Sequence, residues 1–195
     1  MKILCVGTQD ETDLLKARIN DDHKVVQANK ISDITKDVDV VFDFINAAAQ
    51  GGLELYSKLT DKAIFLNSVH ISLAEMTAFQ GTLGCKLYAF NGEPSFFDRD
   101  VLEVSCLEEE DSTALSATLD ALGLPFERVD DRVGMVTPRI IAMIINEAYF
   151  TVQDGTASRE DIDLGMKLGT NYPMGPFEWA EAWGIDRIYE LLDAL

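Results

Sequence analysis

Short, continuous apolar runs alternate with amphipathic stretches over residues 1–130 of the chain. Runs of this kind, bounded by glycine or polar residues, are typical of strands in a parallel sheet, because such strands are buried on both faces. They predict strands at residues 2–7, 23–28, 38–45, 63–68, 86–91, 102–107 and 126–129. Helical spacing of the apolar positions between them predicts helices at 11–20, 52–59, 73–79 and 112–122, with Thr8 or Asp10 as the cap of the first.

The alternation of strands and helices predicts an α/β domain with a mostly parallel sheet and right-handed crossovers. The pattern changes at residues 130–133, and nothing after that point has the pattern of a strand. We therefore place a domain boundary between residues 132 and 133 and expect an all-α domain after it.

In this second part the pattern predicts a helix at 138–152 that is apolar almost all round and hence buried on most faces. A second helix is predicted at 159–168, capped by Ser158 and ended by Gly169. The next residues, N-Y-P-M-G-P-F-E at 171–178, contain two prolines and a glycine. They predict a rigid turn between helices, followed by residues 179–195.

Charge and cysteine content limit the classes of function. The net charge of −18 and the pI of about 4.3 argue against binding to nucleic acid or to an anionic membrane, since both are polyanions. We read Cys5, Cys85 and Cys106 as buried free thiols of a reducing compartment. Only two histidines are available as imidazole ligands, so we expect no metal site. We also expect a cytoplasmic protein without signal peptide or membrane span.

Three motifs in the second part carry a specific resemblance: I-I-N-E-A at 144–148, D-G-T-A-S-R-E-D-I-D at 154–163 and M-K-L-G-T-N-Y-P-M-G-P-F-E at 166–178. With these motifs, residues 134–186 closely resemble the C-terminal domain of 3-hydroxyacyl-CoA dehydrogenases. The resemblance implies that residues 1–132 form a Rossmann-like dinucleotide-binding domain and that 133–195 form the family's helical domain. It also implies a homodimer through the helical domain, an acyl-CoA ligand and NAD as hydride carrier, in fatty-acid or butyrate metabolism.

The cofactor loop departs from the pattern that the family requires. A dinucleotide fold carries G-x-G-x-x-G after its first strand, and here the loop is G-T-Q-D-E-T. Gly7 matches the first glycine, and Thr8 and Gln9 follow it as candidate cofactor contacts. Two acids, Asp10 and Glu11, stand where the phosphate would lie. The acid expected after the second strand is absent, and the interval 29–37 is too short for the helical segment that helps hold coenzyme A in the family.

The reaction residues are also only partly preserved. The family's H-F-F-N-P strand is Y-A-F-N-G-E-P here, so that Tyr88 takes the histidine position and Asn91 matches the asparagine. Glu103 matches the carboxylate that orients the histidine, and Ser68 is a conservative match in N-S-V-H. The lone His70 of that motif could replace the lost histidine or be a bystander. In place of the family's substrate-facing asparagine the chain has Pro138.

Two hypotheses follow from these differences. The first is a compact, degenerate relative that lacks the standard reaction and acts as a dimeric binding or regulatory protein for an acyl-CoA-like or nucleotide-like ligand. The second is an active oxidoreductase with an altered cofactor loop. It would use Tyr88 and Glu103 as its acid–base pair, with Ser68 and Asn91 beside them.

Overall fold

The computed structural model describes residues 1–30, 37–46, 53–56, 59–78 and 83–195, and the described residues form two compact units. We call Met1–Met135 the sheet unit and Val136–Leu195 the helical unit. The division falls three residues beyond the boundary predicted from the sequence pattern. Parts of the predicted helices at 52–59 and 73–79, and most of the interval 29–37, lie outside the described residues.

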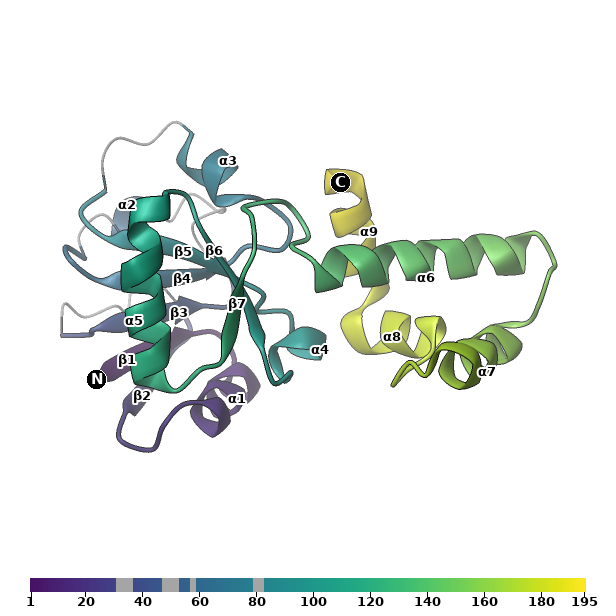
Figure 1. The fold of residues 1–195 in the computed structure, drawn as a ribbon, viewed down its shortest axis with the longest axis horizontal. Coiled ribbons are helices and arrows are strands. Elements are labelled where there is room, and N and C mark those ends of the chain that lie inside the picture. The colour runs from purple at the N-terminus through teal and green to yellow at the C-terminus, as the bar shows by residue number, and fades with distance from the viewer. Residues whose placement is uncertain (31–36, 47–52, 57–58, 79–82) are drawn as a thin grey trace. The chain divides into compact units, whose positions relative to one another are not determined.

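The sheet unit contains a seven-stranded sheet in the order β2-β1-β3-β4-β5-β6-β7 (Figure 1). Its strands are β1 (Lys2–Val6), β2 (Lys24–Ala28), β3 (Val40–Asp43), β4 (Ala63–Asn67), β5 (Lys86–Phe90), β6 (Leu102–Cys106) and β7 (Phe126–Arg128). All neighbouring strands are parallel except β5 and β6, which are antiparallel. The predicted mostly parallel sheet is therefore confirmed.

Alternate residues of the strands face two separate hydrophobic cores. In β5, Tyr88 and Phe90 belong to the core that also contains Leu15 and Leu115, whereas Leu87 and Ala89 belong to the other. The first core is covered by α1 (Gln9–Arg18) and α5 (Ser112–Leu122), and we call this side of the sheet the α1/α5 face. The second core is covered by α2 (Leu53–Tyr56) and α3 (Leu73–Thr77), and we call it the α2/α3 face.

A short helix that the sequence pattern did not predict, α4 (Pro94–Phe97), follows β5. Pro94 starts it, because proline has no N–H to lose in a first helical turn. Its Phe97 side chain is fully buried in the core on the α1/α5 face. This helix therefore fixes the chain just after the carboxyl end of β5.

The helical unit consists of α6 (Thr137–Gln153), α7 (Arg159–Thr170), α8 (Pro176–Trp183) and α9 (Ile185–Ala194). Two predictions made for it are wrong. Helix α7 continues past Gly169, and Asn171 takes the left-handed conformation at its end, with φ of 57°. Helix α6 is not buried on most faces, since Ile140 and Met143 are each 52% exposed and Phe150 is 50% exposed.

Residues 171–178 connect α7 to α8 and continue into α8. The carboxylate of Asp163 on α7 accepts a hydrogen bond from the backbone N–H of Phe177 at 2.8 Å. The Glu178 carboxylate accepts a hydrogen bond from the N–H of Gly175 at 2.9 Å and forms an ion pair with Lys167. A Cβ at Gly175 would lie 2.3 Å from the Asp163 carboxyl carbon, so only glycine fits against α7 here. The predicted rigid turn is thus built from contacts to α7.

Candidate functional site

The carboxyl ends of the parallel strands form the edge of the sheet where a site is expected. Because β1 lies between β2 and β3, the strand order reverses direction there, and ligands of open α/β sheets bind at such a point. Three carboxylates lie at this edge: Glu11 in the first turn of α1 after β1, Asp43 at the end of β3 and Glu93 after β5. Asp43 is fully buried and accepts hydrogen bonds from the Tyr56 hydroxyl at 2.7 Å and the Ile45 N–H at 3.1 Å.

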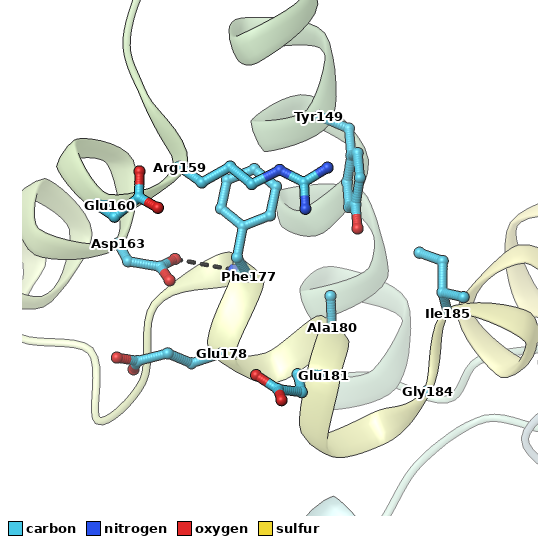
Figure 2. A pocket seen from close by; sticks show the side chains of 10 residues that line it. All are labelled: Tyr149, Arg159, Glu160, Asp163, Phe177, Glu178, Ala180, Glu181, Gly184 and Ile185. Carbon is cyan, nitrogen blue, oxygen red and sulfur yellow. Dashed lines mark hydrogen bonds between the residues drawn. The ribbon is translucent and has the colours of Figure 1, made fainter.

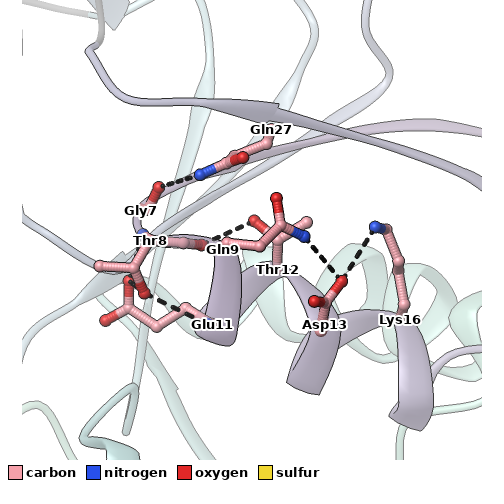
Figure 3. A network of polar contacts seen from close by, with 8 residues as sticks. All are labelled: Gly7, Thr8, Gln9, Glu11, Thr12, Asp13, Lys16 and Gln27. Atoms are coloured by element: carbon pink, nitrogen blue, oxygen red, sulfur yellow. Dashed lines mark hydrogen bonds and ion pairs between the residues drawn. The ribbon is translucent and has the colours of Figure 1, made fainter.

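The loop after β1 is closed by a capping box between Thr8 and Glu11 (Figure 3). The backbone N–H of Thr8 donates to Glu11 Oε2 at 2.7 Å, and the Thr8 hydroxyl donates to the same oxygen at 3.0 Å. In return, the N–H of Glu11 donates to Thr8 Oγ1 at 3.2 Å. This arrangement stabilises the first turn of α1 and occupies the N–H groups of Thr8 and Glu11, two of the donors available to an anion at the start of the helix.

The other predicted cofactor contacts are engaged within the loop as well. The Gln9 side-chain amide donates to Asp13 at 2.8 Å, and Lys16 pairs with the same carboxylate at 3.1 Å (Figure 3). The Gly7 carbonyl accepts from the Gln27 amide at 3.1 Å. The residues present therefore do not fit the pyrophosphate of a dinucleotide, because the Glu11 carboxylate is bound to Thr8 within the loop and brings negative charge to it.

Tyr88 and Glu103 are not brought together by the fold. Tyr88 is fully buried on the α1/α5 face, where its ring packs against Phe65 at a centroid distance of 5.1 Å. Leu102 and Val104 share that face, so Glu103 between them projects from the opposite face of β6. A proton cannot pass directly between two side chains on opposite faces of a sheet.

The environment of Tyr88 is also unsuited to proton transfer. Its hydroxyl is buried and has no hydrogen-bond partner among the described residues. Burial, with a further contribution from the negative charge of Asp111, raises the pKa of Tyr88 to about 12. The structure thus places Tyr88 as a core aromatic residue.

Ser68 and Asn91, the other predicted catalytic residues, have structural roles at the ends of β4 and β5. The Ser68 hydroxyl donates to the Ile71 carbonyl in the turn before α3. The Asn91 N–H donates to the Glu103 carbonyl at 3.0 Å, and its side-chain oxygen accepts from the Glu93 N–H at 3.4 Å. These contacts order the two loops, and both residues are buried.

The side chains that the fold does assemble at this edge are those of Asn67, His70 and Glu93. The Asn67 amide donates to Glu93 Oε1 and to the Phe44 carbonyl, each at 3.1 Å, and its oxygen accepts from the Gly92 N–H at 3.0 Å. His70 Nδ1 lies 3.9 Å from Glu93 Oε1. The Glu93 side chain is only 2% exposed, whereas that of His70 is 28% exposed.

This arrangement places the His70 imidazole between the buried Glu93 carboxylate and the surface. Sequence reasoning did not single out Glu93. The signal available for the local structure was its place directly before Pro94, since proline is favoured at the first position of a helix. Its partner Asn67 lies 26 residues away, and only the parallel pairing of β4 and β5 brings the two together.

The helical unit contains a separate pocket of about 560 Å³ that the sequence did not predict (Figure 2). The Arg159 guanidinium lies over the rings of Tyr149 and Phe177, at 5.2 and 5.1 Å from their centroids. Four carboxylates line the same pocket: Glu160, Asp163, Glu178 and Glu181. Asp163 and Glu178 are bound by the turn described above, so this cluster serves first to hold α6, α7 and α8 together.

The three cysteines of the chain all lie among the described residues. Cys5, Cys85 and Cys106 are free thiols, and burial raises the pKa of each. Among the described residues, no three His, Cys, Asp or Glu side chains gather as metal ligands would. None of the described helices combines the length and the apolar composition that a membrane span requires.

Comparison with known proteins gives a consistent result for the second part of the chain. The model of the 3-hydroxyacyl-CoA dehydrogenase C-terminal domain matches residues 134–195. A 3-hydroxyadipyl-CoA dehydrogenase of Escherichia coli (strain K12) is 48% identical over 68 residues, which are 35% of this chain and 14% of that protein. A probable 3-hydroxybutyryl-CoA dehydrogenase of Bacillus subtilis (strain 168) is 34% identical over 96 residues, 49% of this chain and 33% of that protein.

The similarity extends over most of the chain at lower identity. A probable 3-hydroxyacyl-CoA dehydrogenase of Caenorhabditis elegans is 26% identical over 185 residues, 87% of this chain and 57% of that protein. The structure of an (S)-3-hydroxybutyryl-CoA dehydrogenase from Ralstonia eutropha superimposes with a TM-score of 0.72 at 20% identity, covering 99% of this chain and 86% of that one. This likeness shows a shared fold. The chain spans between 14% and 57% of the length of the three curated relatives.

Proposed function

We propose that the chain is a member of the 3-hydroxyacyl-CoA dehydrogenase family without the standard NAD-dependent reaction, and the match of residues 134–195 to the family's C-terminal domain supports the membership. It would act as a dimeric ligand-binding or regulatory protein for an acyl-CoA-like or nucleotide-like compound. The observation that carries the proposal is the separation of Tyr88 from Glu103 on opposite faces of the sheet. The position that the resemblance assigns to the family's histidine holds the buried phenol of Tyr88. This side chain does not face Glu103, which matches the family's orienting carboxylate.

A second candidate function is an active oxidoreductase of the same family with a relocated acid–base pair. It is favoured by His70 and Glu93, which lie 3.9 Å apart at the carboxyl edge of the sheet. Histidine has an ordinary pKa near neutral pH, so it can both accept and return a proton. In this case the chemistry would not involve Tyr88, and Glu103 would have no part in it.

A turnover assay with variants separates the two. With NADH and acetoacetyl-CoA both present, we expect the wild-type chain to show no loss of NADH absorbance above the enzyme-free rate. NADH alone should leave the melting temperature unchanged, since a ligand that binds only the native state must raise it. Turnover that survives in Tyr88→Phe but is lost in His70→Gln and in Glu93→Gln would overturn the proposal in favour of the relocated pair. Turnover lost in Tyr88→Phe would overturn it in favour of the pair predicted from the sequence.

The assembly that we propose is a homodimer through the helical unit. Its surface carries several half-exposed or more exposed large apolar side chains: Ile140, Met143, Phe150, Leu164, Leu168, Ile185 and Tyr189. Leu168 is 79% exposed and Tyr189 is 69% exposed. Apolar surface of this extent on a small helical unit is typical of an interface, and the family resemblance points to a second copy of the chain as the partner.

We therefore expect sedimentation analysis to give twice the mass of the chain for the wild type and a monomer for the double variant Leu168→Glu/Tyr189→Glu. The matched control is Leu107→Glu, in the sheet unit, where the leucine is 42% exposed. That variant should remain a dimer. A monomeric wild type, or loss of the dimer in the control as well, would show that the helical unit does not form the interface.

A further inference from the structure

We infer that the carboxylate of Glu11 excludes dinucleotides from this sheet by standing as an internal anion in the phosphate position. The inference deepens the proposed function, because it names the residue by which the chain departs from the cofactor use of its family. It also makes a distinction that the loop sequence alone does not make. Loss of the second and third glycines could simply remove a site, whereas the structure shows the N–H and hydroxyl donors of Thr8 bound to a carboxylate of the chain itself.

The geometry of the loop supports this directly. A single oxygen, Glu11 Oε2, accepts from both the N–H and the hydroxyl of Thr8, at 2.7 and 3.0 Å. Thr8 is the N-cap of α1, and in dinucleotide folds the pyrophosphate binds at the N-terminus of this helix. The same oxygen would lie 2.4 Å from a Cβ at Gly7. Glu11 Oε2 therefore binds both donors of Thr8. It also fills the space beside Gly7 that the absence of a side chain would leave open to a phosphate.

The surroundings of the loop strengthen the exclusion. Asp10 lies in the same first turn of α1, and the buried carboxylate of Asp43 lies at the end of the neighbouring strand β3. The lysine nearest in the helix, Lys16, is paired with Asp13 at 3.1 Å. A phosphate entering the loop would thus have to displace a bound carboxylate and approach two further ones, and like charges repel.

The inference is tested on the full-length chain with inorganic pyrophosphate and ADP as probes, by isothermal titration and by the shift of the melting temperature. Glu11→Ala removes the occupying carboxylate, and we expect it to bind both probes at least about tenfold more tightly than the wild type. Glu11→Gln keeps a side chain that can cap Thr8 but removes the charge, so its gain should be smaller. If the loss of the cap prevents Glu11→Ala from folding, the affinity of Glu11→Gln for the two probes decides the test.

Asp10→Ala is the matched control, because it removes an exposed carboxylate from the same turn without opening the loop. We expect no gain in affinity from it. Equal gains in Asp10→Ala and the Glu11 variants would overturn the inference, since net charge rather than occupation of the donors would then explain the exclusion. No gain in affinity in either Glu11 variant would also overturn the inference. The proposed loss of the NADH reaction is tested separately, by the turnover assay.

Discussion

Replacing Phe90 with alanine is expected to lower the free energy of unfolding of the sheet unit by about 3–5 kcal/mol. The side chain is fully buried, and its ring centroid lies 5.4 Å from that of Phe42, 5.1 Å from that of Phe44 and 5.9 Å from that of Phe97. All three contacts are edge-to-face, the geometry in which aromatic pairs contribute beyond the burial of area. Alanine would lose these contacts and leave a cavity between β3, β5 and α4.

Chemical denaturation with urea, followed by circular dichroism, measures this effect. Phe90→Leu retains much of the apolar volume and should cost clearly less than Phe90→Ala. Val101→Ala is the surface control, because Val101 is 45% exposed and its truncation should change the stability by no more than about 0.5 kcal/mol. A cost for Phe90→Ala as small as that of the control would show that this aromatic cluster is not a packed core.

The second large effect is expected at Asn67. Asn67→Ala removes three hydrogen bonds in one step: to the Phe44 carbonyl, from the Gly92 N–H and to the buried carboxylate of Glu93. Each buried polar group that loses a partner costs about 1–3 kcal/mol, and more if it is charged, so we expect a total loss of about 3–5 kcal/mol. The ends of three adjacent parallel strands would lose their common link.

A double-mutant cycle with Glu93→Gln identifies the part of this loss that depends on the carboxylate. We expect the two substitutions to be less than additive by about 1 kcal/mol or more, because the neutral amide of glutamine needs the Asn67 donor less than a carboxylate does. Asn29→Ala is the control, since Asn29 is exposed and should tolerate the same truncation. Additive losses would mean that Asn67 and Glu93 contribute independently.

Much of the sheet unit could be predicted from the sequence because parallel strands buried on both faces leave a strong local signal. The runs that become β1, β3 and β4 are continuous and apolar, and the structure has strands within the predicted ranges. The order of the strands and the antiparallel pairing of β5 with β6 could not be read in the same way. Those features depend on which runs meet in space, which no local pattern encodes.

The site was harder to predict because the sequence does not state which face of a strand a residue occupies. Tyr88 and Glu103 both match family positions, yet the registers of β5 and β6 place them on opposite faces. Conversely, Glu93 lies in a turn with no periodicity, and its contacts come from Asn67 at the end of β4 and from His70 in the loop after it. The two errors in the helical unit have a similar origin, since the exposure of α6 and the end of α7 depend on packing rather than on apolar content.

The fit of Gly175 against Asp163 has a consequence for how relatives of this chain are recognised. Any side chain at position 175 would collide with Asp163 of α7, so the turn needs this glycine for folding whether or not a reaction is carried out. The residues N-Y-P-M-G-P-F-E are therefore compatible with chains that carry out the reaction and with chains that do not. Membership inferred from this turn reports ancestry and architecture, and an active dehydrogenase must be recognised from its cofactor loop and acid–base pair.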